Sequence, residues 1–189
     1  MLSQRVKLLK PSPTLALAAK AKELKDQGRD VISLTVGEPD WDTYENVKLE
    51  GIQAIQKGNT KYQPASGIPE LRKAIAQQVS ADFDVSYAAE EVTVTAGAKF
   101  VVFGALQAVV DPGDEVLLGA PYWVSYPTMI ELAGGGPRIA DCREVDRFLL
   151  TAELMKTHIT TKTKAVILNS PSNPTGQLYT REELAKIGE

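Results

Sequence analysis

The alternation of apolar and polar positions divides this chain into amphipathic helices and short strands. Apolar residues that recur every three or four positions predict helices, and short apolar runs between turn residues predict strands. Pro69 suits the first position of a helix, Gly58 suits the end of one, and Thr180 suits an N-cap. We expect helices over residues 15–25, 46–57, 69–79, 98–110, 123–133, 151–158 and 180–187, and strands over residues 31–36, 91–95, 115–118, 138–141 and 164–168.

From about residue 91 onward, the predicted strands and helices alternate. This alternation is typical of an α/β fold whose strands run mainly parallel. In open sheets of this kind, the loops after the carboxyl ends of the strands line the ligand crevice. A composition shift at residues 37–45 marks the boundary that we expect between an N-terminal arm and the α/β body.

Composition excludes several classes of function. The 189 residues include 21 Lys and Arg against 24 Asp and Glu, one histidine and one cysteine. These counts exclude an internal disulfide, a cysteine-rich zinc site and a two-histidine metal site, and the slightly acidic balance gives no general attraction to nucleic acid or anionic membranes. The longest apolar run, Phe100–Leu106, is far shorter than the ~20 residues that span a bilayer. Because the first residues also lack a signal-peptide core, we expect a cytoplasmic protein with no membrane or nucleic-acid partner.

The segment Val92–Phe100 combines a predicted strand, a small-residue turn and a helix start. The first N–H groups of a helix have no partner within it and favour an anion, which Gly97 and Ala98 would let approach closely. Taken alone, the segment is better explained as a tight strand-to-helix turn. Lys99 shifts this balance, because a cation in the first turn opposes the helix dipole at a cost of roughly 0.3–1 kcal/mol that a bound anion would offset. The alternative is a lysine that extends into water.

Two further loops follow predicted strands. Asn169–Gly176 holds two prolines, two asparagines and a glycine, so its backbone has little freedom, and Asn173 could offer an amide to a ligand. A purely structural turn would explain the same residues. Trp123 could stack on an aromatic ligand, although core packing is the better explanation for a lone tryptophan. Three such loops at one sheet edge would together point to a site more strongly than each alone.

Six motifs run through nearly the whole chain, at Lys10–Thr14, Leu34–Asp40, Thr60–Arg72, Asp111–Val116, Pro121–Pro127 and Asn169–Gly176. In order and spacing they resemble the class I, fold-type I aminotransferases that depend on pyridoxal 5'-phosphate (PLP), and most of all the N-terminal half of the bacterial aspartate aminotransferases. The resemblance implies a three-layer α/β/α PLP-transferase fold with an incomplete sheet. It also implies an arm and small-domain segment at residues 1–44, and the N-terminal part of the PLP-binding large domain at residues 45–189.

The resemblance implies a role in PLP binding for each matching residue. The backbone of Gly97, Ala98 and Lys99 would hold the cofactor phosphate. Trp123 would stack on the pyridine ring and lie beside the substrate. Asn173 would donate to the ring oxygen and help to hold the substrate α-carboxylate. The peptide bonds before Pro121 and Pro174 would be cis.

The resemblance also implies how the substrate and a second subunit would be bound. Lys99 would pair with the distal carboxylate of aspartate or glutamate, close to Ser12 and Thr14. The backbone of Gly37 would lie beside the α-carboxylate. Tyr62 would reach across a homodimer interface to the cofactor phosphate of the partner. The substrates would be an amino acid and a 2-oxo acid.

Several of the family's reactive groups have no match in these residues. The Schiff-base lysine, the aspartate of the ring nitrogen and the α-carboxylate arginine would all lie beyond Glu189. We therefore expect a chain that is half of a protein, inactive by itself, with the missing C-terminal half as a partner. The alternatives are an aromatic or prephenate aminotransferase, or a non-catalytic remnant that binds a phosphate ligand or a partner chain. Consecutive parallel strands are usually neighbours, but the resemblance separates the strands predicted at 91–95 and 115–118.

Overall fold

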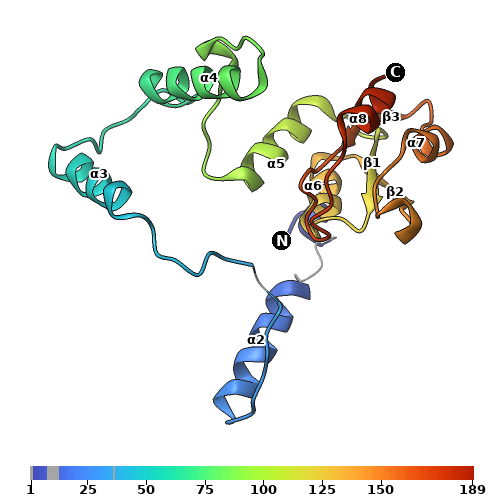
Figure 1. Ribbon diagram of the computed structural model, residues 1–189, viewed down its shortest axis with the longest axis horizontal. Helices are drawn as coiled ribbons and strands as arrows, with labels where there is room; N and C mark the ends of the chain where they lie inside the picture. The colour runs from blue at the N-terminus through green and yellow to red at the C-terminus, as the bar shows by residue number, and fades with distance from the viewer. Residues whose placement is uncertain (1, 8–12, 36) are drawn as a thin grey trace. The chain divides into compact units, whose positions relative to one another are not determined.

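The computed structural model describes residues 2–7, 13–35 and 37–189 (Figure 1). They divide into two compact units. We refer to residues 13–35 and 37–96 as the helical unit, and to residues 2–7 and 97–189 as the layered unit.

The layered unit is built on a three-stranded parallel sheet. Strand β1 (Glu115–Ala120) lies between β2 (Gly136–Asp141) and β3 (Thr163–Ile167). The register of β1 with β2 is regular from Glu115 opposite Gly136 to Ala120 opposite Asp141, whereas the register with β3 shifts after Glu115. The three strands predicted in this part of the chain are therefore confirmed, and so is their parallel direction.

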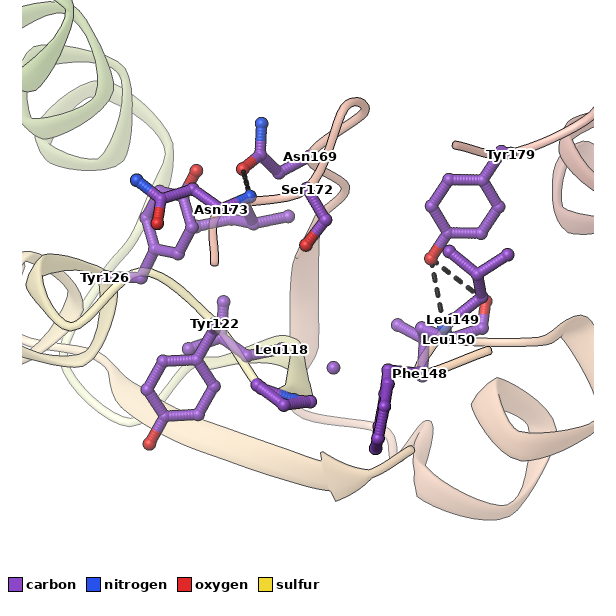
Figure 2. Close-up of a pocket in the computed structure, with 13 residues that line it drawn as sticks. Leu118, Tyr122, Tyr126, Phe148, Leu149, Leu150, Asn169, Ser172, Asn173 and Tyr179 are labelled. Carbon is purple, nitrogen blue, oxygen red and sulfur yellow. Dashed lines mark hydrogen bonds between the residues drawn. The ribbon is translucent and has the colours of Figure 1, made fainter. Parts of the chain in front are cut away.

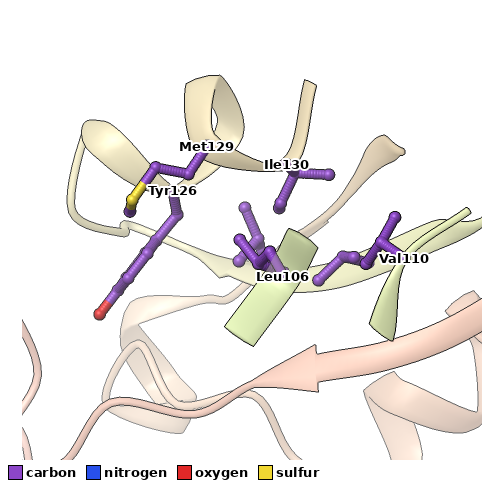
Figure 3. Close-up of a cluster of buried hydrophobic side chains, with 7 residues drawn as sticks. Leu106, Val110, Tyr126, Met129 and Ile130 are labelled. Carbon is purple, nitrogen blue, oxygen red and sulfur yellow. The ribbon is translucent and has the colours of Figure 1, made fainter. Parts of the chain in front are cut away.

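Helices cover both faces of this sheet. Successive residues of a strand point to opposite faces, so Leu117 faces one helical layer, and Val116 and Leu118 face the other; all three are fully buried. The two clusters give the unit three layers, α/β/α. On one side, α5 (Ala98–Val109) and α6 (Ser125–Ala133) contribute Leu106, Tyr126, Met129 and Ile130 (Figure 3). On the other side lie Ala140, Cys142, Leu150 and Met155 of α7 (Ala152–His158), with Ile187 of α8 (Arg181–Gly188).

The helix starts on the second face are fixed by side-chain caps. Thr151 accepts a hydrogen bond from the N–H of Leu154 at the start of α7 (3.2 Å). At α8, the N–H of Glu183 donates to Thr180 Oγ1 (3.2 Å) and the N–H of Thr180 donates to Glu183 Oε2 (2.7 Å), which forms a capping box. The predicted N-cap at Thr180 is confirmed, whereas α6 begins two residues later than predicted.

Polar side chains connect the strands toward their amino ends. Thr160, which precedes β3, donates its hydroxyl to the Glu115 carboxylate at the start of β1 (2.8 Å). Arg138 of β2 lies 3.9 Å from the same carboxylate and donates to the carbonyl oxygen of His158. These contacts join β1, β2 and the segment before β3 through side chains as well as through backbone hydrogen bonds.

The helical unit contains three of the predicted helices, α2 (Pro13–Asp26), α3 (Glu45–Gln56) and α4 (Pro69–Phe83). Pro69 opens α4 as expected, and Gly58 follows α3 with a φ of 76°. Two 3₁₀ turns, η1 (Ala89–Glu91) and η2 (Glu144–Asp146), and the short α1 (Gln4–Lys7) were not predicted. None of the helices in residues 2–7, 13–35 and 37–189 is both long and apolar enough to cross a membrane.

Two predicted strands are wrong. Residues 31–35 form no strand, and Val36 lies outside the described residues. Val92 is extended, but the segment contacts α4 and the loop before it: the N–H of Val94 donates to the Ser66 carbonyl (2.9 Å) and Arg72 Nε donates to the Val92 carbonyl (2.8 Å). An extended segment without a backbone ladder is not a strand. Both edges of β1 are occupied by β2 and β3. Because residues 91–95 form no strand, the separation implied by the resemblance stays a prediction, and the consecutive strands β1 and β2 are neighbours.

Candidate functional site

A pocket lies at the carboxyl ends of β1 and β3, where the fold places the loops that follow these strands (Figure 2). Its lining combines an apolar wall with polar groups from the loop after β3. Tyr126 comes from the start of α6, and burial raises the pKa of its phenol, so it stays neutral at ordinary pH. The lining residues are Leu118, Gly119, Pro121, Tyr122, Tyr126, Phe148, Leu149, Leu150, Ile167, Asn169, Ser172, Asn173 and Tyr179.

The start of α5 has the geometry of an anion site. Gly97 has a φ of 87°, which residues with a side chain rarely adopt, and a Cβ at this position would meet no atom within 4 Å. The first hydrogen bonds within the helix run from the N–H groups of Phe100 and Val101 to the Gly97 carbonyl. The N–H groups of Ala98 and Lys99 therefore have no partner inside the helix. The positive φ requires glycine here, and the space beside it is open.

Lys99 lies against Trp123 instead of extending away into water. Its ammonium is 5.0 Å from the centre of the tryptophan ring, a cation–π contact worth roughly 0.5–1 kcal/mol at an exposed site. The side chain is exposed and takes part in none of the ion pairs found within the described residues. A cation is therefore held at the end of a helix dipole that disfavours it.

Trp123 packs at the edge of the core, as one of the two explanations left open by the sequence requires. Its ring packs edge-on against Tyr126, with the ring centres 5.4 Å apart and the planes at 89°, and it contacts the α5–α6 cluster. The residue is nevertheless only partly buried, and Lys99 lies over its ring. Trp123 thus lies at the edge of the core and is not fully buried.

The loop from Asn169 to Gly176 is held by its own hydrogen bonds. The N–H of Asn173 donates to Asn169 Oδ1 (2.8 Å), and the N–H of Gly176 donates to the Ser172 carbonyl (2.7 Å). The Asn173 side chain is exposed at the pocket. The cis peptides predicted before Pro121 and Pro174 are confirmed, and the one before Pro171 was not predicted.

Five of the nine predicted site residues lie in the layered unit: Gly97, Ala98, Lys99, Trp123 and Asn173. The structure brings Lys99 and Trp123 into contact and places Asn173 at the pocket.

The other four predicted site residues belong to the part of the chain before residue 97. Tyr62 is fully exposed in the loop before α4. A Cβ added at Gly37 would meet no atom within 4 Å. Ser12 lies outside the described residues, as does the side chain of Thr14.

Sequence reasoning missed the residues on the far wall of the pocket. Tyr179, Phe148 and Leu150 line it, yet Tyr179 and Leu150 are 29 positions apart in the chain. The available signal was a tyrosine directly before the N-cap Thr180, which favours packing of its ring at the helix start.

The titratable groups do not suggest a metal centre. Within residues 2–7, 13–35 and 37–189, no three His, Cys, Asp or Glu side chains are grouped so that they could hold a metal ion. Burial, with the charges of Asp141 and Asp146, raises the pKa of the Cys142 thiol to about 11, so it stays protonated and unreactive. What the site offers is helix N–H groups, an ammonium, an aromatic face and an amide.

Comparisons with known proteins show relatives along the whole chain. The aspartate aminotransferase of Bacillus sp. (strain YM-2) is 49% identical over 189 residues, all of this chain and 48% of that protein. The probable aspartate/prephenate aminotransferase of Aquifex aeolicus (strain VF5) is 50% identical over 188 residues, 100% of this chain and 48% of that protein. The chain thus spans about half the length of the curated relatives it matches.

Solved structures show the same fold. The aspartate aminotransferase of Thermus thermophilus, solved with maleate, superposes with a TM-score of 0.94 at 46% identity, over 99% of this chain and 49% of that one. The aspartate aminotransferase of Thermotoga maritima gives a TM-score of 0.92 at 42% identity, over 98% of this chain and 50% of that one. The three-layer fold predicted from the motifs is confirmed.

The profile of the family described as aminotransferase class I and II matches residues 29–189. The match includes the start of α5, Trp123 and the Asn173 loop. The chain belongs to the class I and II aminotransferase family.

Proposed function

We propose that this chain forms the phosphate-binding and distal-carboxylate side of an aspartate aminotransferase, which exchanges an amino group between aspartate or glutamate and a 2-oxo acid. The observation that carries the proposal is the ammonium of Lys99 held 5.0 Å from the Trp123 ring at the start of α5. A cation at that end of a helix is unfavourable unless an anion is bound nearby. A dicarboxylate beside a phosphate would supply that anion.

The residues present fit PLP. The open space beside Gly97 and the N–H groups of Ala98 and Lys99 suit a phosphate, and the partly exposed Trp123 would stack on a flat ring. Asn173, exposed at the pocket beside Tyr122 and Tyr126, would donate to the ring oxygen. When bound, PLP supplies the electron sink of the reaction, and the protein supplies orientation and a base.

On the substrate side, this chain would hold both carboxylates. Lys99 would bind the distal carboxylate, with Ser12 and Thr14 from the N-terminal segment beside it. Asn173 and the backbone of Gly37 would hold the α-carboxylate. These groups would fix which end of the substrate faces the cofactor, and orientation of this kind is a large part of what an active site contributes.

The proposal includes a homodimer. Tyr62, which is fully exposed here, would donate its hydroxyl to the cofactor phosphate of the other subunit. It also includes the domain boundary near residue 44, with residues 1–44 as arm and small-domain segment and residues 45–189 in the large domain, and a cytoplasmic location. The chain's own part in the reaction is to bind and orient, because it contains no match to the family's Schiff-base lysine.

The test is the substrate dependence of a Lys99→Met variant in a full-length enzyme that carries these 189 residues. An ionic hydrogen bond is worth about 1.5–3 kcal/mol, so kcat/KM for aspartate should fall about 10- to 100-fold, while that for phenylalanine, which has no distal carboxylate, should stay within about threefold. Lys73→Met, which removes an exposed charge from α4, is the control. Equal losses for both substrates would contradict the role of Lys99.

Aspartate/prephenate specificity is the second candidate, because relatives such as that of Aquifex aeolicus carry this name. Prephenate is also a dicarboxylate, so Lys99 suits it equally. Steady-state assays with aspartate, prephenate and phenylalanine distinguish the two specificities. An enzyme indifferent to aspartate would overturn the first proposal.

A further inference from the structure

Tyr179 occupies a particular place on the wall of the pocket. It follows the Asn169–Gly176 loop in the chain and is partly buried, and its hydroxyl bonds to both backbone groups of one residue (Figure 2). The N–H of Leu150 donates to the Tyr179 hydroxyl (2.9 Å), and the hydroxyl donates to the Leu150 carbonyl (3.4 Å). Two bonds to the backbone of one residue fix the tyrosine relative to the wall more firmly than one would.

The same residue also fixes the end of the loop. The N–H of Tyr179 donates to Ser170 Oγ (3.3 Å), near the point where the loop leaves β3. Within the loop, the N–H of Ser172 donates to the Gln177 carbonyl (2.9 Å). Both ends of the loop that carries Asn173 therefore meet at Tyr179, and Tyr179 is attached to Leu150.

The segment to which Tyr179 is attached has an unusual backbone. Arg147 and Phe148 have φ values of 54° and 55°, in the left-handed region that residues with side chains rarely adopt. Such conformations persist where surrounding contacts enforce them, and they cluster at functional sites. Here the Phe148 N–H donates to the Arg143 carbonyl (3.0 Å), and the Arg147 guanidinium pairs with Glu183. The strained turn places Phe148 on the pocket lining.

We propose that Tyr179 is a positioning residue of the pocket, which holds the Asn173 loop at a fixed distance from the wall formed by Leu149 and Leu150. The proposal rests on the function proposed above for the identity of the ligand. Tyr179 acts through Asn173 and does not itself touch the ligand. Burial raises the pKa of its phenol, so the hydroxyl stays neutral and can both accept from and donate to Leu150.

The first test is amide hydrogen exchange in the chain without any ligand. Tyr179→Phe removes only the hydroxyl, and one lost hydrogen bond corresponds to about a fivefold change in an equilibrium. We expect exchange at the amides of Ser172, Asn173 and Gly176 to become about fivefold faster, while β1 is unaffected. Tyr44→Phe, at an exposed tyrosine of the helical unit, is the matched control. Unchanged exchange in the loop would overturn the proposal.

The second test asks whether Tyr179 acts through Asn173. The dissociation constant for PLP is measured from tryptophan fluorescence in four proteins: unsubstituted, Tyr179→Phe, Asn173→Ala and the double variant. We expect Tyr179→Phe to weaken binding about fivefold, and by less than about twofold once Asn173 is alanine. Equal losses in both backgrounds would overturn the role of Tyr179 as a positioning residue.

The two tests distinguish this proposal from the function on which it rests. If the unsubstituted chain does not bind PLP, the proposed cofactor bed is contradicted, and the exchange measurement still decides the role of Tyr179. Ser170→Ala removes the second anchor of the loop and leaves the phenol in place. It should accelerate exchange at the same three amides; if Tyr179→Phe does not fold, unchanged exchange in Ser170→Ala overturns the proposal.

Discussion

The helices of the helical unit and those of the layered unit differ in how far they are buried, and the longer helices are not the more buried ones. Helix α3 has 12 residues and buries none of them, and α4 has 15 residues and buries only Ala76. In the layered unit, α6 has nine residues and buries Tyr126, Met129 and Ile130. Ile52 of α3 is 51% exposed, whereas Ile130 is fully buried.

This difference separates two contributions to the stability of a helix, local sequence signals and packing of its apolar stripe. The apolar stripe, the proline at the first position and the glycine after the last turn define α3 and α4 locally, whether or not anything covers the stripe. Most of the stability of a helix in a protein comes from packing of that stripe. The layered unit supplies the packing through two clusters on the two faces of one sheet.

The largest expected effect on stability comes from truncating a buried isoleucine in the layered unit, and it is compared with truncating an exposed isoleucine in the helical unit. Ile130→Ala should lower the free energy of unfolding by about 2–5 kcal/mol, because it loses apolar burial and leaves a cavity. Ile52→Ala should change it by less than about 0.5 kcal/mol. Urea unfolding followed by circular dichroism measures both, and similar losses would show that α3 is covered in solution.

A glycine in each unit gives a smaller effect of opposite sign. A Cβ on Gly119 of β1 would lie 2.9 Å from both Cys142 Sγ and Leu150 Cβ, so Gly119→Ala should destabilise the protein by about 1–3 kcal/mol. A Cβ on Gly51 of α3 would meet nothing within 4 Å, and alanine is favoured over glycine in a helix interior by up to about 1 kcal/mol. Thermal unfolding of the two variants measures the signs. Destabilisation by Gly51→Ala would mean that a neighbour packs closely on α3.

The last effect is a pH dependence of stability. It is absent at neutral pH and comes from one buried thiol in the layered unit. Burial raises the pKa of Cys142 to about 11, whereas a thiol in the unfolded chain has a pKa of about 8.5. The unfolded state therefore loses its proton first as pH rises. The contribution of the thiol to stability is complete below about pH 8.5 and falls toward pH 11.

Urea unfolding near pH 7.5 and pH 9.5 measures this loss below the usual range of tyrosine. Cys142→Ala should remove the part of the alkaline decrease that the thiol causes. An identical decrease in the variant would assign the effect to another group.

The elements that could be predicted from the sequence are those defined by local signals. Helix bounds followed from Pro69, Gly58 and Thr180, and the strands of the layered unit followed from apolar runs between turns. The strand predicted at 91–95 was wrong because a strand depends on a partner, and here Val92 and Val94 bond to Arg72 and Ser66.

For the site, the residues carried by motifs could be named in advance, and those defined by long-range contacts could not. Lys99 and Trp123 belong to motifs, but their mutual contact depends on how α5 packs beside the loop after β1. The bonds between Tyr179 and Leu150 join positions 29 residues apart and leave no periodic signal. The left-handed turn at Arg147 and Phe148 was equally hidden, because neither is a residue type that favours positive φ.

The side-chain contacts at the amino end of the sheet have a consequence for engineering. Glu115, Thr160 and Arg138 connect the strands through side chains at the end opposite the pocket, in addition to the backbone hydrogen bonds of the sheet. Exchanging loops at the carboxyl end for those of a relative would leave these amino-end contacts in place. At the carboxyl end, the contacts that such an exchange would have to keep are those of Tyr179 with Leu150 and Ser170.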